Sequence, residues 1–517
     1  MDQMPKGPPP AADSAAPDNP DAAAAFAYSR WAGHTPLSHA ELRRIVFGIM
    51  LAMFLGALDQ TIVATALPSI SGAFGEAENL SWVVTAYLLT STAVTPLYGK
   101  LSDMVGRRTM MLAGIAIFMA GSLIAALATD MLMLILGRAV QGLGAGGLLP
   151  LAQTVIGDVV LPKERGRYQS YMGIMWMSAA ILGPLLGGGL SQYLHWSLIF
   201  WINIPLGLLA FWLCDRTLRR VSQVMRPHRL DVLGSALMMA AAVALLLALT
   251  TGGVRYPWLS APVIGLVALS AALWVLFFWR LAKAEEPFVP LTMLSNPVVR
   301  LGTLGAACNV AAMIGMTIFL PLYFDMVHGL SASHSGVALI PLVVISNIAA
   351  VFSGRSLGWF HHYKRVPIVG LSLSLVSALA LAWQPYAPLP LVLVEIAAIG
   401  SGIGTVYPVT TVSVQNAVPR YQLGIVTGTM NFFRMLLSAV IVAALGALVL
   451  GGVNIKGETG LSVAVIKASA GGAELALIFR WVFAAIALVL GTALVALLAM
   501  EERPLAGRAD IPKAAKE

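Results

Sequence analysis

The stretch Gly99–Arg108 reads Gly-Lys-Leu-Ser-Asp-Met-Val-Gly-Arg-Arg and joins two long apolar runs, at residues 80–99 and 109–128. Its two glycines, Gly99 and Gly106, permit a tight turn between the runs. A helix needs about 20 apolar residues to cross the ~30 Å of hydrocarbon in a bilayer. The stretch therefore predicts two membrane-spanning helices joined by a short charged turn at one membrane surface.

The same pattern of apolar runs and short polar turns continues along the chain. The other predicted spans are residues 45–67, 131–157, 168–190, 197–214, 231–250, 259–279, 300–322, 335–353, 366–383, 389–411, 424–450 and 475–499. The boundaries near Pro150 and at residues 320–340 are the least distinct. Together with the first pair these runs predict an all-α membrane protein of fourteen transmembrane helices.

Composition supports a lipid environment. Hydrophobic residues make up 58% of the 517 residues, charged residues 11%, and the mean hydropathy is +0.82, whereas soluble domains carry about 25% charged residues. The net charge of +8 would suit a nucleic-acid partner only if the cations clustered on a hydrophilic surface. They lie instead in short loops between apolar runs, so the predicted partner is the lipid bilayer and no nucleic acid is expected.

Loop cations predict the orientation, because cytoplasmic loops are enriched in Lys and Arg. With the N-terminus in the cytoplasm, 26 of the 32 Lys and Arg residues fall in cytoplasmic segments and 3 in outer ones. This asymmetry predicts a multi-pass plasma membrane protein, in a bacterial cell inner membrane, with both termini cytoplasmic.

An internal repeat suggests how the helices divide. After the tenth run, Gly354–Arg365 again follows a glycine with a short basic turn, although it lacks the acidic residue and the second glycine of Gly99–Arg108. Two six-helix halves with an inserted pair would place both turns equivalently. The predicted division is 1–40, a disordered cytoplasmic tail; 41–214, the N-terminal half; 215–299, the inserted pair; 300–500, the C-terminal half; and 501–517, a second cytoplasmic tail.

Further motifs lie inside the apolar runs. Leu58–Pro68 carries Asp59, Arg138–Gly146 carries Arg138 and Gln141, and Ala179–Gly188 holds Gly183-Pro184 and Gly187-Gly188. Phe200–Gly207 and the pair Phe433-Arg434 complete the set. With Gly99–Arg108, these motifs resemble the major facilitator superfamily, in its fourteen-helix drug:proton antiporter branch. The resemblance covers nearly the whole membrane region, with departures at Ala64, Ala179, Ser197 and Leu198.

The resemblance implies a secondary active transporter that exports amphipathic or cationic drugs in exchange for protons by alternating access. Its implied partners are a small-molecule substrate, protons and the bilayer, and one chain is expected to act as a monomer. No cofactor is expected, because the proton gradient supplies the energy and the sequence holds no phosphate-binding loop for ATP.

Two motifs are expected to act as conformational switches. Asp103 can accept charge-assisted hydrogen bonds from arginines such as Arg107 and Arg108, or from a helix N-terminus. By resemblance it latches the two halves together in the outward-open state, and the alternative is an ordinary solvated loop. Pro184 bends its helix and the neighbouring glycines allow close helix approach, which is compatible with a packing role alone.

Charged residues inside apolar runs are the sharpest indication of function. A charge at the bilayer centre costs on the order of 2.5–3.5 kcal/mol on insertion scales, so a partner and a role are expected. Counting 1.5 Å per residue from the membrane surfaces puts Asp59, Arg138 and Glu395 at roughly similar depths of about 8–10 Å from the outer surface. The sequence therefore predicts that they share one layer of the bundle.

We expect Asp59 to be the leading proton-binding site and Glu395 a second proton- or cation-binding site. Arg138 would tune Asp59 through its charge, and a cationic substrate would compete with the proton. The open alternatives are a structural ion pair between Asp59 and Arg138 and a purely interfacial Glu395. Arg434 is either the partner of Glu395 or a cation that serves helix packing.

Aromatic and polar side chains could line a substrate cavity. The candidates are Gln141, Trp82, Tyr87, Trp176 and Tyr407, with Arg434 beside them. For the aromatic residues, packing or an interfacial position is the alternative.

Other functions fit less well. A single-metabolite transporter remains open because of the departures from the motifs. A polytopic membrane enzyme would need a reactive cluster at one membrane face, but the one His pair, His361-His362, has no flanking carboxylate. The two cysteines, Cys214 and Cys308, show no metal-ligand spacing, so neither an enzyme nor a metal site is expected.

Overall fold

The computed structural model describes residues 39–75, 79–219, 221, 230–253, 255–360, 362–453 and 472–505. Within these residues it contains fourteen helices long and apolar enough to cross a membrane, and each predicted run lies on one of them. The predicted count of fourteen is confirmed for the described part of the chain. Of the predicted tails at residues 1–40 and 501–517, residues 1–38 and 506–517 lie outside the described residues, and residues 39–40 belong to the first helix.

The first group of helices runs from α2 to α8. Its members are α2 (His39–Phe74), α3 (Leu80–Val105), α4 (Arg107–Ala126), α5 (Met131–Val159), α6 (Pro162–Tyr193), α7 (Leu198–Trp201) and α8 (Asn203–Leu218). Pro150 lies inside α5 without ending it, and α7 and α8 share one crossing, Leu198–Leu218, interrupted at Ile202.

The remaining helices run from α9 to α19. They are α9 (Val232–Thr251), α10 (Ala261–Lys283), α11 (Leu291–Ser295), α12 (Pro297–His328), α13 (Ala332–Ala338), α14 (Ile340–Ser356), α15 (Arg365–Trp383), α16 (Leu389–Asn416), η2 (Arg420–Gln422), α17 (Leu423–Val453) and α19 (Gly472–Ala499). The indistinct boundary at 320–340 is resolved by Gly329, which ends α12 in the left-handed conformation that glycine adopts without strain.

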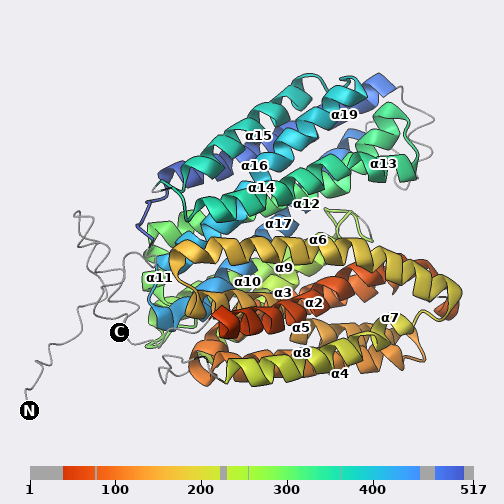
Figure 1. The fold of residues 1–517 in the computed structure, drawn as a ribbon. Coiled ribbons are helices and arrows are strands. Elements are labelled where there is room, and N and C mark those ends of the chain that lie inside the picture. The colour runs from red at the N-terminus through yellow and green to blue at the C-terminus, as the bar shows by residue number, and fades with distance from the viewer. Residues whose placement is uncertain are drawn as a thin grey trace, which may run out of the picture.

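Figure 1 shows two groups of helices, one containing α2, α4, α5 and α8 and the other containing α14, α15, α16 and α19. Each group has its own apolar core. The pair α9 and α10 pack against each other, and α9 also contacts α3 and α17. Residues of α10 such as Val267, Val275 and Phe278 are exposed, as expected for an apolar surface whose solvent is lipid. This is the arrangement of two six-helix halves with an inserted pair.

The two groups converge at the end of the bundle that holds the turn between α3 and α4, which we call the Gly106 end, and they spread apart toward α7 and α13 (Figure 1). Gly106 has φ 106°, so the sharp turn from α3 into α4 requires glycine. The most extensive contacts between the groups are those of α3 with α17 and of α6 with α14, and α5 with α17 and α6 with α16 also touch.

Glycines allow these two helix pairs to touch backbone to backbone. A Cβ on Gly99 would lie 2.4 Å from the carbonyl oxygen of Gly424, and one on Gly354 would lie 2.2 Å from that of Gly166. Gly99 and Gly354 belong to the two similar turns in the sequence. The repeat thus places a close glycine contact at the Gly106 end in each half.

Candidate functional site

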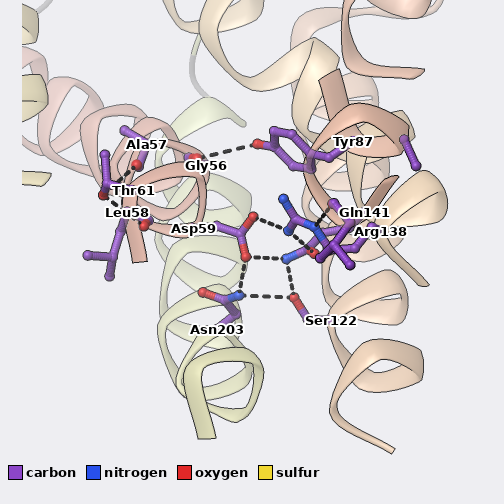
Figure 2. A network of polar contacts seen from close by, with 12 residues as sticks. Gly56, Ala57, Leu58, Asp59, Thr61, Tyr87, Ser122, Arg138, Gln141 and Asn203 are labelled. Atoms are coloured by element: carbon purple, nitrogen blue, oxygen red, sulfur yellow. Dashed lines mark hydrogen bonds and ion pairs between the residues drawn. The ribbon is translucent and has the colours of Figure 1, made fainter. Parts of the chain in front are cut away.

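Asp59 lies on α2 with no exposed surface and accepts hydrogen bonds from three side chains (Figure 2). Arg138 Nη1 donates to Oδ2 at 2.5 Å, Gln141 Nε2 donates to Oδ1 at 2.6 Å, and Asn203 Nδ2 donates to Oδ1 at 2.9 Å. The donors come from α5 and α8. Ser122 on α4 accepts from Gln141 at 2.7 Å and from Asn203 at 3.1 Å, so four helices share this network.

The Arg138 side chain has several bonding partners besides Asp59. Its Nε donates to the carbonyl oxygen of Val83 at 3.0 Å, and its Nη1 also donates to Gln141 Oε1 at 2.6 Å. The guanidinium lies 4.3 Å from the centre of the Tyr87 ring, close enough for a cation–π interaction. A buried ion pair offsets its loss of hydration only when further hydrogen bonds satisfy both ions, and this pair has them.

The predicted meeting of Asp59 and Arg138 is therefore seen, as an ion pair inside the N-terminal half. Gln141 and Tyr87, named as candidates for a cavity, belong to this network. Ser122 and Asn203 were not predicted as partners of Asp59. Their signal was a polar side chain inside an apolar run, which requires a hydrogen-bond partner when buried; the chain alone does not say which partner.

Glu395 takes no part in the Asp59 network. It is half-buried on α16, and its Oε2 is buried without a hydrogen bond among the described residues. Similar depth thus did not bring Glu395 into contact with Asp59 or Arg138, because depth says nothing about rotation around a helix axis.

Arg434 lies on α17 with 3% of its surface exposed. Its guanidinium sits 5.0 Å from the centre of the Tyr407 ring. Its Nε and Nη1 are buried without a hydrogen bond among the described residues. The predicted alternative of a pair with Glu395 is wrong in this conformation, since the side chain stacks on Tyr407 instead.

The two tryptophans named as cavity candidates pack in apolar clusters. Trp82 packs against the cluster that contains Met238 of α9, and Trp176 packs against the core of the N-terminal group. Both fit the packing alternative. Tyr407 differs, because its hydroxyl accepts a hydrogen bond from Gln153 Nε2 across the two groups.

The Gly-Pro motif of α6 packs against α2 next to Asp59. A Cβ on Gly183 would meet Thr61 Oγ1 at 2.0 Å, and one on Gly187 would meet the carbonyl oxygen of Ile62 at 2.3 Å, whereas Gly188 faces open space. Pro184 lies inside α6, which continues through it. Two of the three glycines therefore serve close helix packing, and Thr61 is only two residues from Asp59.

Asp103 joins the two halves at the Gly106 end. Its Oδ1 accepts from the backbone N–H of Gly424 at 3.0 Å and its Oδ2 from that of Ile425 at 2.8 Å, both in the first turn of α17. A helix N-terminus favours a carboxylate at this position. Arg107 pairs with Asp103 and, at 2.9 Å, with Asp158 of α5.

Asp103 and Arg107 are both buried, so the alternative of a solvated loop is wrong for them. Arg108 is more exposed and pairs with Asp215 of α8. A second bond between the groups lies nearby, where Arg420 Nη2 donates to the carbonyl oxygen of Asp158. The Gly106 end is therefore closed by charge-assisted hydrogen bonds as well as by glycine contacts.

Exchanging Asp103 for Asn should loosen this contact. The amide offers one acceptor in place of two and loses the ion pair with Arg107. Hydrogen bonds to charged groups contribute about 1.5–3 kcal/mol, so amide exchange at Gly424 and Ile425 should accelerate about tenfold or more. Hydrogen–deuterium exchange of the peptide spanning 420–430 measures this, with Asp130→Asn at the opposite end as control. Unchanged protection would contradict the latch.

Solved structures share the arrangement of helices. The human organic anion transporter MFSD10 superposes with a TM-score of 0.59 at 14% identity, covering 87% of this chain and 99% of that one. A bacterial homologue of the iron transporter ferroportin, in an outward-facing state, gives 0.59 at 13% identity, covering 87% and 98%. At these identities the likeness establishes the fold alone.

Relatives with known names are more similar in sequence. The multidrug transporter protein MdtP of Bacillus subtilis is 35% identical over 404 residues, which cover 78% of this chain and 74% of the relative. Multidrug resistance protein 3 of the same organism is 34% identical over 62% of each chain. Efflux pump dotC of Dothistroma septosporum is 34% identical over 77% of this chain and 70% of the pump.

The described residues thus form fourteen membrane-length helices in two contacting groups, with an ion pair buried inside one of them, which is the architecture of a polytopic membrane protein. The family model described as Major Facilitator Superfamily matches residues 49–231 and 226–443. The chain belongs to the major facilitator superfamily, whose members are transporters and not enzymes.

Proposed function

We propose that the protein exports amphipathic or cationic compounds in exchange for protons. The observation that carries the proposal is the buried Asp59 network, because a carboxylate paired with an arginine can exchange that ion pair for a proton. Relatives named as multidrug transporters or efflux pumps support the proposal that the transported compounds are drugs of this kind. The fold supports alternating access, in which one half rocks against the other around a site between them.

Protonation of Asp59 would weaken its contact with Arg138, since a protonated oxygen no longer accepts as an anion. Arg138 and Gln141 lie on α5, and so do Gln153, which bonds to Tyr407, and Asp158, which bonds to Arg107. One helix, α5, thus connects the Asp59 network with the contact between the halves. From Arg138 to Gln153 the distance along α5 is roughly 22 Å, and a shift of the helix would act on both ends.

Glu395 is proposed as a second proton- or cation-binding site. Its buried Oε2 has no partner among the described residues, so a proton or a cation could occupy it without breaking an existing bond. In a vesicle assay, Glu395→Gln should lower the number of protons exchanged per cargo molecule while transport continues. An unchanged stoichiometry would leave Glu395 as an interfacial residue.

The orientation and the domain limits are also proposals. The excess of cations in alternate loops supports cytoplasmic termini in a bacterial inner membrane, and it would place the Gly106 end in the cytoplasm. The helix groups support two halves with an inserted pair, whereas the proposed limits at 40 and 214 fall within α2 and α8, which begins at Asn203 and ends at Leu218. Several of the loop cations, including Arg226, Lys456 and Lys467, lie outside the described residues. Tags on the two termini should react on the same, inner side of the membrane.

A panel of compounds tests the cargo and separates the main proposal from the single-metabolite alternative. Cells with and without the gene are grown with lipophilic cations, neutral amphipathic compounds and organic anions of similar size. We expect at least a fourfold higher inhibitory concentration for several unrelated compounds when the gene is expressed. Protection against none of them would contradict multidrug export and favour one specific metabolite.

A further inference from the structure

Arg434 differs from the other buried arginines in its bonding partners. Arg138 and Arg107 each pair with carboxylates, and Arg165 donates to the carbonyl oxygens of Val160 and Gly157. Arg434 is 3% exposed, and within the described part of the chain its Nε and Nη1 donate to nothing.

Such an arginine cannot relieve its burial by losing a proton, since the guanidinium stays charged in proteins. A buried cation without a counter-ion is strongly unfavourable, and the stacked ring of Tyr407 at 5.0 Å offsets only part of that. Within the membrane-spanning region, a functional role is the default expectation for an ionisable residue of this kind.

The surroundings of Arg434 lie where the two halves meet. Gln153 of the N-terminal half bonds to Tyr407 of α16 and, through Oε1, accepts from Asn431 Nδ2 of α17 at 2.8 Å. Asn431 lies one turn before Arg434, and its Oδ1 is buried without a hydrogen bond among the described residues. The unbonded N–H groups of Arg434 and an unbonded amide oxygen thus lie in the same region as the Tyr407 ring.

We propose that Arg434 binds an anionic group of the transported compound. The unpaired N–H groups supply the donors, the Tyr407 ring supplies a surface for an aromatic or apolar body, and Asn431 Oδ1 can accept from a polar hydrogen on the same compound. Among the amphipathic compounds of the proposed function, the Arg434 site then favours those that carry an anionic group, as organic anions or zwitterions. This inference rests on the proposed function, because it takes the bound compound to be the cargo.

Two matched probes test the charge preference by binding alone. 8-Anilinonaphthalene-1-sulfonate and N-phenyl-1-naphthylamine share one aromatic body and differ by the sulfonate. Binding of each to the purified protein in nanodiscs is measured by calorimetry, with empty nanodiscs subtracted. We expect Arg434→Gln to weaken binding of the sulfonate at least tenfold and to leave binding of the neutral probe within twofold. Arg480→Gln, which removes another helix-borne cation, is the control and should change neither.

Equal losses for both probes, or no loss for the sulfonate, would overturn the inference. So would failure of the unaltered protein to bind the sulfonate in preference to the neutral probe. Because binding is read without a proton gradient, selective loss of anion binding alongside absent proton exchange would contradict the proposed function and leave the Arg434 site standing. Proton-coupled export of cations with no anion binding would support the proposed function and contradict the Arg434 site.

A stability measurement without any ligand tests the inference independently of the binding measurements. If the charge of Arg434 is compensated only by a bound anion, Arg434→Met should raise the unfolding temperature of the protein without ligand, because an uncompensated buried charge is removed. Arg138→Met should lower it, because Asp59 then loses its counter-ion. A fall of similar size in both variants would show that Arg434 only supports packing and would overturn the inference.

Discussion

Replacing Asp59 by Asn should abolish proton-driven export and destabilise the N-terminal half. The amide keeps the size of the side chain but removes the charge that compensates Arg138, and its NH₂ group faces donors from Gln141 and Asn203. Removing one partner of a buried ion pair costs about 3–5 kcal/mol. Export is measured in cells, and the unfolding temperature on purified protein.

A double variant separates the two effects. Asp59→Asn combined with Arg138→Gln removes both charges, and neutral replacement of a whole buried pair is often close to neutral for stability. We expect the double variant to recover most of the lost stability and none of the proton-driven export. The control is Asp130→Asn, which alters the residue that caps the N-terminus of α5. This variant should export normally. Export by the stable double variant would assign the pair a purely structural role.

The second large effect is expected at the glycines that close the Gly106 end. Alanine at Gly99 would press a methyl group to 2.4 Å from the Gly424 carbonyl oxygen, and alanine at Gly354 would do so at 2.2 Å from that of Gly166. Contacts this short force the helices apart, because the opposing atoms are backbone. Each variant should lose more than about 90% of transport while folding normally, since the clash exists only when this end is closed.

Gly188→Ala provides the matched control, because a Cβ there meets nothing within 4 Å. Closure is followed by hydrogen–deuterium exchange at the first turn of α17, where the Gly99 and Gly354 variants should exchange faster and the Gly188 variant should not. Normal transport by Gly99→Ala and Gly354→Ala would mean that the halves need not approach this closely during the cycle.

The spans were predictable because the apolar runs are long and their ends are marked by charge. Pro150, near which one boundary was indistinct, lies within a continuous helix, and so does Pro321, as neighbouring helices permit in a membrane. The break between α7 and α8 at Ile202 was not predicted, because Pro205, which lies in the first turn of α8, does not by itself end a helix in a membrane.

The candidate site was predictable in part. Charge and depth pointed to Asp59 and Arg138, and the motif glycines pointed to the latch at Asp103. The roles of Ser122 and Asn203 were not accessible, because a single polar residue in an apolar run does not identify its partner. Glu395 failed to join Asp59 for a related reason, since helix rise fixes height in the membrane and leaves the facing direction open.

The most direct test of the central claim is substrate-driven proton movement in vesicles that contain only the purified protein. A compound that gives resistance in the panel is added on one side, and a pH-sensitive dye reports on the interior. The account predicts proton movement opposite to the compound for the unaltered protein, and none for the Asp59→Asn, Arg138→Gln double variant. Compound movement without protons, or equal proton movement in both proteins, would contradict exchange through Asp59.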